Sequence, residues 1–178
     1  MGPDPKQLER PIWSALTTTH ASFALGNDLA RRYPPDISPM AAVRDVSEDP
    51  CLQSLTKLLA PGDVVGLFST EPVPADRNLA VIAQKVVDQM VYERGEAAHI
   101  SGVVVKLTPA DVPEMLHLAE LTKPGPFAAR TIALGSASAA AASWSHGGRT
   151  DEVRWLHRNL SGVFTSRSPW ARAFILAC

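Results

Sequence analysis

The stretch VVVKLTPADVPEMLHLAELTKPGPFAARTIALG, residues 103–135, decides the predicted fold. Four of its first five residues are apolar and three are β-branched, which predicts a buried strand over residues 103–107. Asp111 and Glu114 have the spacing of a capping box, and Thr108 with Asp111 offers a second helix start one turn earlier. A helix is therefore predicted to follow the strand, and both starts remain open.

This helix is predicted to bury one face and to end abruptly. Its apolar positions are Val112, Met115, Leu116, Leu118 and Ala119. Pro124-Gly125-Pro126 predicts a helix end followed by a stiff loop, because proline cannot continue the hydrogen-bond pattern. A second short helix is expected over residues 127–134, with Gly135 as its cap.

Two segments of the N-terminal third allow more than one interpretation. The run Thr17-Thr18-Thr19-His20 predicts a cap for a helix that continues to Ala30, with Gly26-Asn27 as a point of interruption. The following Arg31-Arg32-Tyr33-Pro34-Pro35 is expected to break regular structure. It would then be either an anion contact or a solvated helix end with Tyr33 packed below.

Residues 41–92 predict two strands separated by a helix, and one ambiguous segment. The strands are expected at 41–46 and 64–68, and the helix is expected to open at Asp49-Pro50. Its buried face would contain Leu52, Leu55, Leu58 and Leu59. Residues 79–92 fit a helix that buries Ile82, Val86 and Met90, and they also fit an extended segment.

A strand, a helix, a rigid loop and a short helix also open the catalytic domain of GNAT N-acetyltransferases. The strings LTPADVPEML and TKPGPFAARTIALG resemble that opening in a bacterial branch of the family, in which a GNAT-like half precedes the catalytic half. The string PIWSALTTTHASFALGNDLARRYPPDISPMAAVRD resembles the preceding half. The resemblance covers about residues 10–135.

This resemblance implies an α/β (α+β) fold, with a mixed sheet flanked by helices and an incomplete catalytic half. It implies an N-terminal GNAT-like half over residues 1–98 and the start of the catalytic half over 99–135. Residues 136–178 are expected to be an atypical tail. The related sequences also have strand-like text before Gln-Met-Val, so residues 79–92 are expected to be extended.

The resemblance further implies that the chain transfers acetyl from acetyl-CoA to a primary amine, which would belong to a small molecule or to a peptide. The residues expected to line the acceptor side are Thr122, Pro124, Gly125, Pro126 and Phe127. The alternative for these five residues is a stiff helix stop with Phe127 in the core. No catalytic or cofactor-binding residue is identified.

The tail departs from the family pattern. A GNAT domain should have an Arg/Gln-x-x-Gly-x-Gly/Ala loop there, whose backbone N–H groups bind the pyrophosphate of acetyl-CoA. The chain contains no such motif, so activity is expected to be impaired, and the alternative is a non-catalytic GNAT-derived remnant or interaction module. Residues 157–160 and 164–173 can be encoded so that reading one base later gives GNAT-like text. We therefore hypothesise that the tail is disordered or frame-shifted after Leu134.

Composition excludes several other classes of protein. The net charge of −1 gives no reason to expect nucleic acid or an anionic membrane as a partner. Cys51 and Cys178 are too few for a disulfide framework, and the five histidines lack metal-ligand spacing. Cys51 lies near a predicted helix N-terminus, which would lower its pKa, but no basic partner is evident, and a small packed thiol is the preferred interpretation. We expect a cytoplasmic protein without a metal, and self-association if missing strands expose apolar edges.

Overall fold

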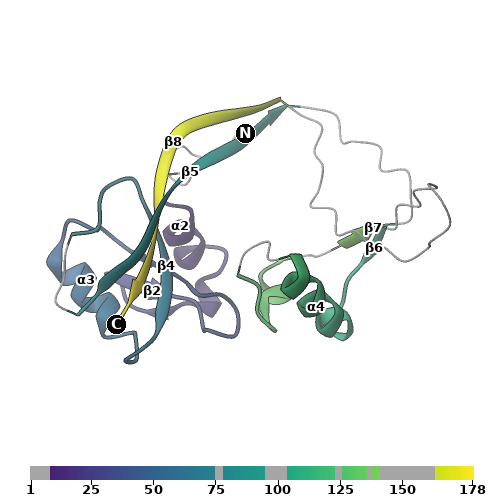
Figure 1. Ribbon diagram of the computed structural model, residues 1–178, viewed down its shortest axis with the longest axis horizontal. Helices are drawn as coiled ribbons and strands as arrows, with labels where there is room; N and C mark the ends of the chain where they lie inside the picture. Colours follow the sequence, from purple (N-terminus) through teal and green to yellow (C-terminus); the bar gives the residue numbers. More distant parts are fainter. Residues whose placement is uncertain (1–8, 75–77, 95–103, 123–125, 136–137, 141–162) are drawn as a thin grey trace. The chain divides into compact units, whose positions relative to one another are not determined.

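A six-stranded mixed sheet organises the chain (Figure 1). The computed structural model describes residues 9–74, 78–94, 104–122, 126–135, 138–140 and 163–178. The strands of the sheet, in spatial order, are β1 (Leu25–Gly26), β2 (Ala30–Arg32), β3 (Met40–Val43), β4 (Val64–Ser69), β8 (Val163–Ala177) and β5 (Ala80–Arg94). The chain combines this mixed sheet with α-helices, so the predicted α/β fold class is confirmed.

The chain divides into two compact units. Unit 1 consists of Met1–Val91 and Ser166–Cys178, and unit 2 consists of Tyr92–Thr165. The boundary predicted at residues 98 and 99 remains a prediction. Within the tail that was expected to be atypical, residues 163–177 form strand β8, which pairs with β4 from Val64↔Ala177 to Ser69↔Arg172. Residues 141–162 lie outside the described part of the chain.

Strands β3 and β4 are parallel neighbours, whereas β1–β2, β2–β3 and β4–β8 are antiparallel. A parallel pair needs a crossover connection, and helix α3 (Asp49–Thr56) supplies it. The strand predicted at 41–46 is thus observed as β3, and the strand predicted at 64–68 as β4. The helix predicted to open at Asp49-Pro50 is confirmed as well.

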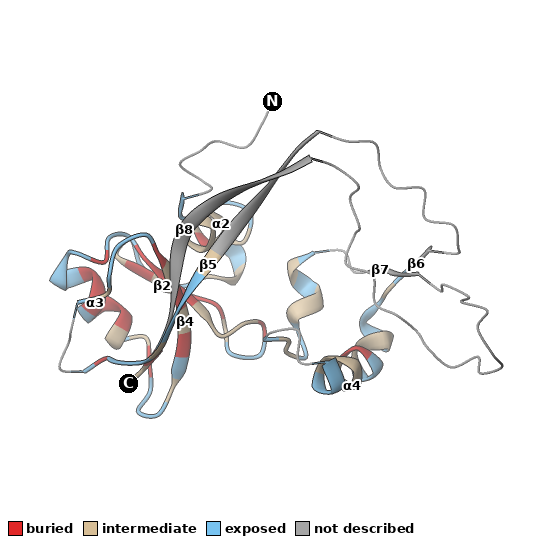
Figure 2. Ribbon diagram, turned by 45° about the horizontal axis from the view of Figure 1, so that its top comes forward, coloured by how far each residue is buried: buried red, intermediate tan, exposed pale blue. Residues whose placement is uncertain are grey.

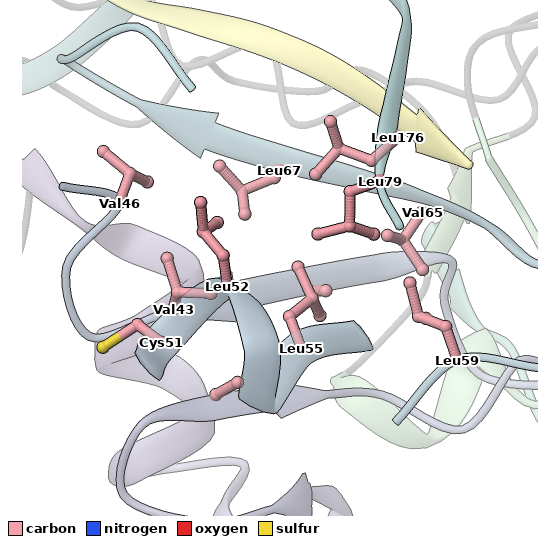
Figure 3. Close-up of a cluster of buried hydrophobic side chains, with 12 residues drawn as sticks. Val43, Val46, Cys51, Leu52, Leu55, Leu59, Val65, Leu67, Leu79 and Leu176 are labelled. Atoms are coloured by element: carbon pink, nitrogen blue, oxygen red, sulfur yellow. The ribbon is translucent and has the colours of Figure 1, made fainter. Parts of the chain in front are cut away.

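The core of unit 1 lies between α3 and one face of the sheet. Leu52 and Leu55 of α3 point toward strand residues that include Leu67 (Figure 3), and these three side chains are at most 1% exposed. Burying one such side chain contributes roughly 1.5–3 kcal/mol. The cluster also contains Val43, Val46, Cys51, Leu59, Val65, Leu79 and Leu176. Leu176 belongs to β8, so the C-terminal strand contributes directly to this core.

The helix predicted from Thr17 through Ala30 is wrong. Helix α2 spans Pro11–Thr17, and the threonines end it. The Thr17 hydroxyl donates to the Trp13 carbonyl at 2.8 Å, and the Thr18 hydroxyl donates to the Ser14 carbonyl at 2.6 Å. These hydroxyls satisfy carbonyls at a helix C-terminus, where sequence analysis expected them to cap an N-terminus.

A 3₁₀ helix, η1 (Ala21–Phe23), and a tight β1–β2 connection follow α2. Gly26 has a φ of 124°, and a Cβ placed there would lie 2.2 Å from the Ala30 carbonyl oxygen. The Asn27 side chain accepts hydrogen bonds from the backbone N–H groups of Leu29 and Ala30 at 2.8 and 3.1 Å. The interruption expected at Gly26-Asn27 is therefore a chain reversal.

The ambiguous segment 79–92 is extended. Strand β5 runs from Ala80 to Arg94, so the helical alternative is wrong and the expectation from the resemblance is confirmed. Ile82 and Val86 are 58% and 62% exposed, whereas Leu79, directly before the strand, is buried in the core. The helical interpretation required Ile82 and Val86 to be buried together, and the strand leaves both exposed.

Unit 2 contains a two-stranded sheet and helix α4 (Val112–Thr122). Strand β6 (Val104–Lys106) pairs antiparallel with β7 (Ser138–Ala140). The predicted strand is confirmed, but its predicted burial is wrong, because Val105 is 54% exposed. The second helix is shorter than predicted, since residues 131–134 alone form the 3₁₀ helix η3 (Thr131–Leu134), with Gly135 at its C-cap.

Candidate functional site

A hollow of about 490 Å³ lies beside α4 in unit 2. It is lined by Pro113, Leu116, His117, Ala119, Glu120 and Phe127. Phe127 comes from the segment after the helix, and the other five residues come from α4. This volume is within the range of a site for a small ligand.

The spacing of the helical residues explains why they share one side. Pro113, Leu116, His117 and Glu120 occupy positions i, i+3, i+4 and i+7 of α4. The capping box of Thr108 and Asp111 begins a 3₁₀ helix, η2 (Pro109–Asp111), which leads directly into α4. The Asp111 carboxylate accepts hydrogen bonds from the Thr108 N–H at 2.7 Å and from its hydroxyl at 2.9 Å. Of the two predicted helix starts, the structure therefore shows the earlier one, at Thr108 and Asp111.

The hollow combines an apolar wall with two titratable side chains. Leu116 and Phe127 are half-buried, whereas His117 and Glu120 are exposed. An exposed carboxylate attracts a cation, and an aromatic face attracts one as well. The arrangement can therefore hold a small cationic molecule with an apolar part.

The five residues predicted to line the acceptor side have different positions. Phe127 lines the hollow, and Pro126 is exposed outside the lining. The Thr122 hydroxyl donates to the Leu118 carbonyl at 2.8 Å, which commits it to the end of α4. Pro124 and Gly125 lie outside the described residues. The assignment of these five residues to a substrate site remains a prediction.

Sequence reasoning overlooked His117 and Glu120 as members of a shared site. The signal that could have found them is their spacing, since both lie on the side of the helix that contains Pro113 and Leu116. The expected apolar face was only partly buried. Met115 is 6% exposed, whereas Leu116 and Ala119 are half-buried and line the hollow.

The arginine pair in unit 1 is structural. Arg32 belongs to β2 and is 5% exposed. Its guanidinium donates to the Asp63 carboxylate at 2.7 Å and to the Leu58 carbonyl at 3.1 Å. Arg31 donates to the Asp28 carboxylate at 3.1 Å and to the Leu16 carbonyl at 3.0 Å. The expected break of regular structure is wrong for the two arginines, which lie in β2 and bind groups of the protein itself. It is confirmed for Tyr33-Pro34-Pro35, where the strand has ended.

Two further side chains near this pair are packed into unit 1. Tyr33 is 3% exposed, as one interpretation expected, and its hydroxyl lies 2.8 Å from Nδ1 of His20. Cys51 is fully buried, and burial raises the pKa of its thiol. The packed-thiol interpretation is confirmed, and the expected fall in pKa at the helix N-terminus is wrong.

The loop between β3 and α3, residues 44–48, is closed by its own side chains. The Arg44 guanidinium donates to the Glu48 carboxylate at 2.6 Å, and the Cys51 thiol donates to the same oxygen at 3.4 Å. The Asp45 carboxylate accepts hydrogen bonds from the Ser47 N–H at 2.8 Å and from its hydroxyl at 2.7 Å. Among the described residues, no group of three His, Cys, Asp or Glu side chains could hold a metal ion.

Comparison with known proteins places the fold. No protein-family profile and no curated protein matches the chain. Its structure is similar to a crystal structure from Novosphingobium aromaticivorans, provisionally assigned as an acetyltransferase of the GNAT family, with a TM-score of 0.73 and 22% identity. The match covers 96% of this chain and 97% of that chain. The chain therefore has a GNAT-type fold, as the resemblance implied.

Two further features of the chain are its lack of a membrane-spanning helix among the described residues and the state of its cysteines. In the part of the chain that the structure describes, no helix has the length and apolar character needed to cross a membrane. The two cysteines, Cys51 and Cys178, have free thiols.

Proposed function

We propose that the chain is a GNAT-type acyltransferase that transfers an acetyl group from acetyl-CoA to a primary amine. The observation that supports this most strongly is the GNAT-type fold, since the similarity extends over 96% of the chain. The protein of known structure has only a provisional activity, so the reaction is our proposal for this chain. The rate is expected to be low, because the sequence lacks the phosphate-binding motif.

The hollow beside α4 is the proposed site for the acceptor amine. The Glu120 carboxylate would attract the amine as an ammonium ion, and Phe127 and Leu116 would contact its apolar part. An ammonium ion must lose a proton before its nitrogen can attack a carbonyl carbon. His117 lies on the same side of α4 and could accept that proton. Acetyl-CoA would supply the acetyl group.

A non-catalytic GNAT-derived module is the second candidate. It is favoured by the absence of an Arg/Gln-x-x-Gly-x-Gly/Ala motif from the whole sequence. Without the backbone N–H groups of such a loop, a GNAT-type fold loses its main means of holding a pyrophosphate. Such a module would contact another protein or a second copy of the chain. A cytoplasmic location is proposed under either candidate.

The two candidates differ in the release of free CoA. The purified full chain would be incubated with acetyl-CoA and a panel of primary amines, and free CoA thiol would be measured. The acyltransferase proposal expects amine-dependent release. It also expects Glu120→Gln to lower kcat/KM by about fivefold, the size of one exposed charge contact.

The matched control is Glu114→Gln, because Glu114 is exposed on the same helix and does not line the hollow. Equal losses in the two variants would contradict the placement of the amine beside Glu120. If no amine releases CoA from a cooperatively folded chain, the non-catalytic candidate is correct.

A further inference from the structure

The β3–α3–β4 crossover of unit 1 has the geometry in which α/β folds commonly bind phosphate groups. The carboxyl end of β3 leads through residues 44–48 to the N-terminus of α3, and β4 runs parallel beside β3 with Met40↔Gly66 and Ala41↔Leu67 in register. Ligands of open α/β sheets bind at the carboxyl ends of strands. A helix N-terminus there offers free N–H groups and a positive dipole end.

In this crossover, several of the backbone N–H groups already have partners. The N–H groups of Cys51 and Leu52 both donate to the Glu48 carbonyl, at 2.9 and 3.4 Å. Pro50, in the first turn of α3, has no N–H. The Ser47 N–H is taken by the Asp45 carboxylate. A pyrophosphate needs several convergent donors, and these four positions offer it none.

The charges at this place are also unfavourable for an anion. Asp45, Glu48 and Asp49 are three carboxylates within five residues, and Arg44 is the one cation among residues 44–49. The hydrogen bond from Arg44 holds the pKa of Glu48 below its usual value, and the bonds from Ser47 do the same for Asp45. Both carboxylates are therefore ionised at neutral pH. The Arg44 charge is already paired with Glu48.

We propose that the carboxylates of the β3–α3–β4 crossover prevent phosphate groups from binding there, so that residues 44–52 do not hold the pyrophosphate of CoA. The fold implies acetyl-CoA, and the residues of this crossover do not fit it. If the chain binds CoA, the contacts to the pyrophosphate come from residues outside 44–52. The inference depends on the proposed function only for the choice of CoA as a probe.

The test follows the backbone amide resonances of the ¹⁵N-labelled full chain during titration with CoA and, separately, with inorganic pyrophosphate. The resonances of residues 44–52 are expected to stay in place at saturating CoA, while shifts elsewhere would locate the real contacts. Saturable shifts at residues 44–52 with either probe would overturn the inference. If CoA shifts no resonance at all, the proposed function fails and this inference stands.

A charge-matched pair of variants makes the test independent of the resonance assignment. Arg44→Ala is expected to change the calorimetric Kd for CoA by less than about twofold, because Arg44 already binds Glu48. Lys57→Ala is the control, since Lys57 is an exposed cation at the other end of α3. A loss of affinity of about fivefold or more in Arg44→Ala, but not in Lys57→Ala, would show that Arg44 binds a phosphate group in place of Glu48. That result would overturn the inference.

Discussion

Helices α3 and α4 both follow a short strand, and they are held in place by different means. The side chain of Glu48, the N-cap residue of α3, accepts no hydrogen bond from a backbone N–H of the helix, yet Cys51, Leu52 and Leu55 are at most 1% exposed. α4 follows directly on a 3₁₀ helix that the capping box of Thr108 and Asp111 begins, and Met115 is the one buried side chain of α4. Figure 2 shows the contrast as a buried face on α3 and a largely exposed or half-buried surface on α4.

The difference teaches that a strong local signal and a large tertiary contribution are separate properties. Capping contributes about 1 kcal/mol and can be read from four consecutive residues. Burial contributes more, but it depends on residues far away in the sequence. Leu52 and Leu55, for example, share a cluster with Leu176 of β8.

Leu55→Ala is expected to have the largest effect. Leu55 is 0% exposed within the cluster under α3, so its truncation should lower the free energy of unfolding by about 2–5 kcal/mol. Leu121→Ala is the control, because Leu121 of α4 is 68% exposed and should cost less than about 0.5 kcal/mol. Urea denaturation followed by circular dichroism measures both, and equal losses would contradict the contrast between the helices.

Arg32→Ala should have the next largest effect. The change removes a buried guanidinium and its hydrogen bonds to Asp63 and Leu58, with an expected cost of about 2 kcal/mol. Arg44→Ala is the comparison, since the Arg44–Glu48 pair is roughly half exposed and should contribute little. The same urea experiment compares the two variants. A larger loss of unfolding free energy in Arg44→Ala than in Arg32→Ala would contradict the prediction that the buried Arg32–Asp63 pair contributes more to stability.

Asp63→Asn should change how stability depends on pH. The hydrogen bond from Arg32, followed by that from the Ala60 N–H, lowers the pKa of Asp63 from its usual 3.8. The stabilisation is therefore present above pH 4 and is lost as pH falls through the lower, folded-state pKa. Asp63→Asn should be less stable at pH 7 and should lose less stability on acidification. Asp28→Asn, at a 94% exposed side chain, is the control. Identical acid profiles for Asp63→Asn and the wild type would refute the prediction.

Thr108→Ala should have the smallest and most local effect. It removes the hydroxyl that caps the segment leading into α4, at a cost of about 1 kcal/mol confined to unit 2. Hydrogen exchange of the α4 amides should become about fivefold faster, while that of the α3 amides stays the same. Thr108→Ser keeps the hydroxyl and should restore protection. Faster exchange in both helices would show that the two units are not separate in stability.

Several elements were predictable because their signals are local. Asp49-Pro50 marks the start of α3, and Thr108 with Asp111 marks the start of the helical segment in unit 2. The β-branched runs at β4 and β6 predicted strands. In each case the deciding residues lie within about six positions of one another, and no distant partner is needed to interpret them.

Other features depend on partners that a local pattern does not contain. Strand β8 lies between β4 and β5 although about a hundred residues separate it from β4 in the sequence, and nothing near Val163 indicates this position. The threonines after Trp13 have the composition of an N-cap, but they end α2 because their hydroxyls turn back to its carbonyls. The burial of Arg32 depends on Asp63, which is 31 residues away.

The candidate site was predictable in part. Phe127 was expected from the family resemblance, and it lines the hollow beside α4. His117 and Glu120 were overlooked, because two polar residues on one side of a helix usually just face solvent. Only their position in the lining of the hollow sets these two residues apart. The closed loop of residues 44–48 could not be recognised either, since its hydrogen bonds follow from the folded geometry.

Calorimetric titration of acetyl-CoA into the purified full chain, with thermal unfolding of the same samples, tests the central claim most directly. A GNAT-type acyltransferase whose residues 44–52 do not hold the pyrophosphate should bind acetyl-CoA saturably, with a rise in Tm that Arg44→Ala preserves. Absence of binding by a chain that unfolds cooperatively would contradict the acyltransferase proposal and leave a GNAT-type fold without its cofactor.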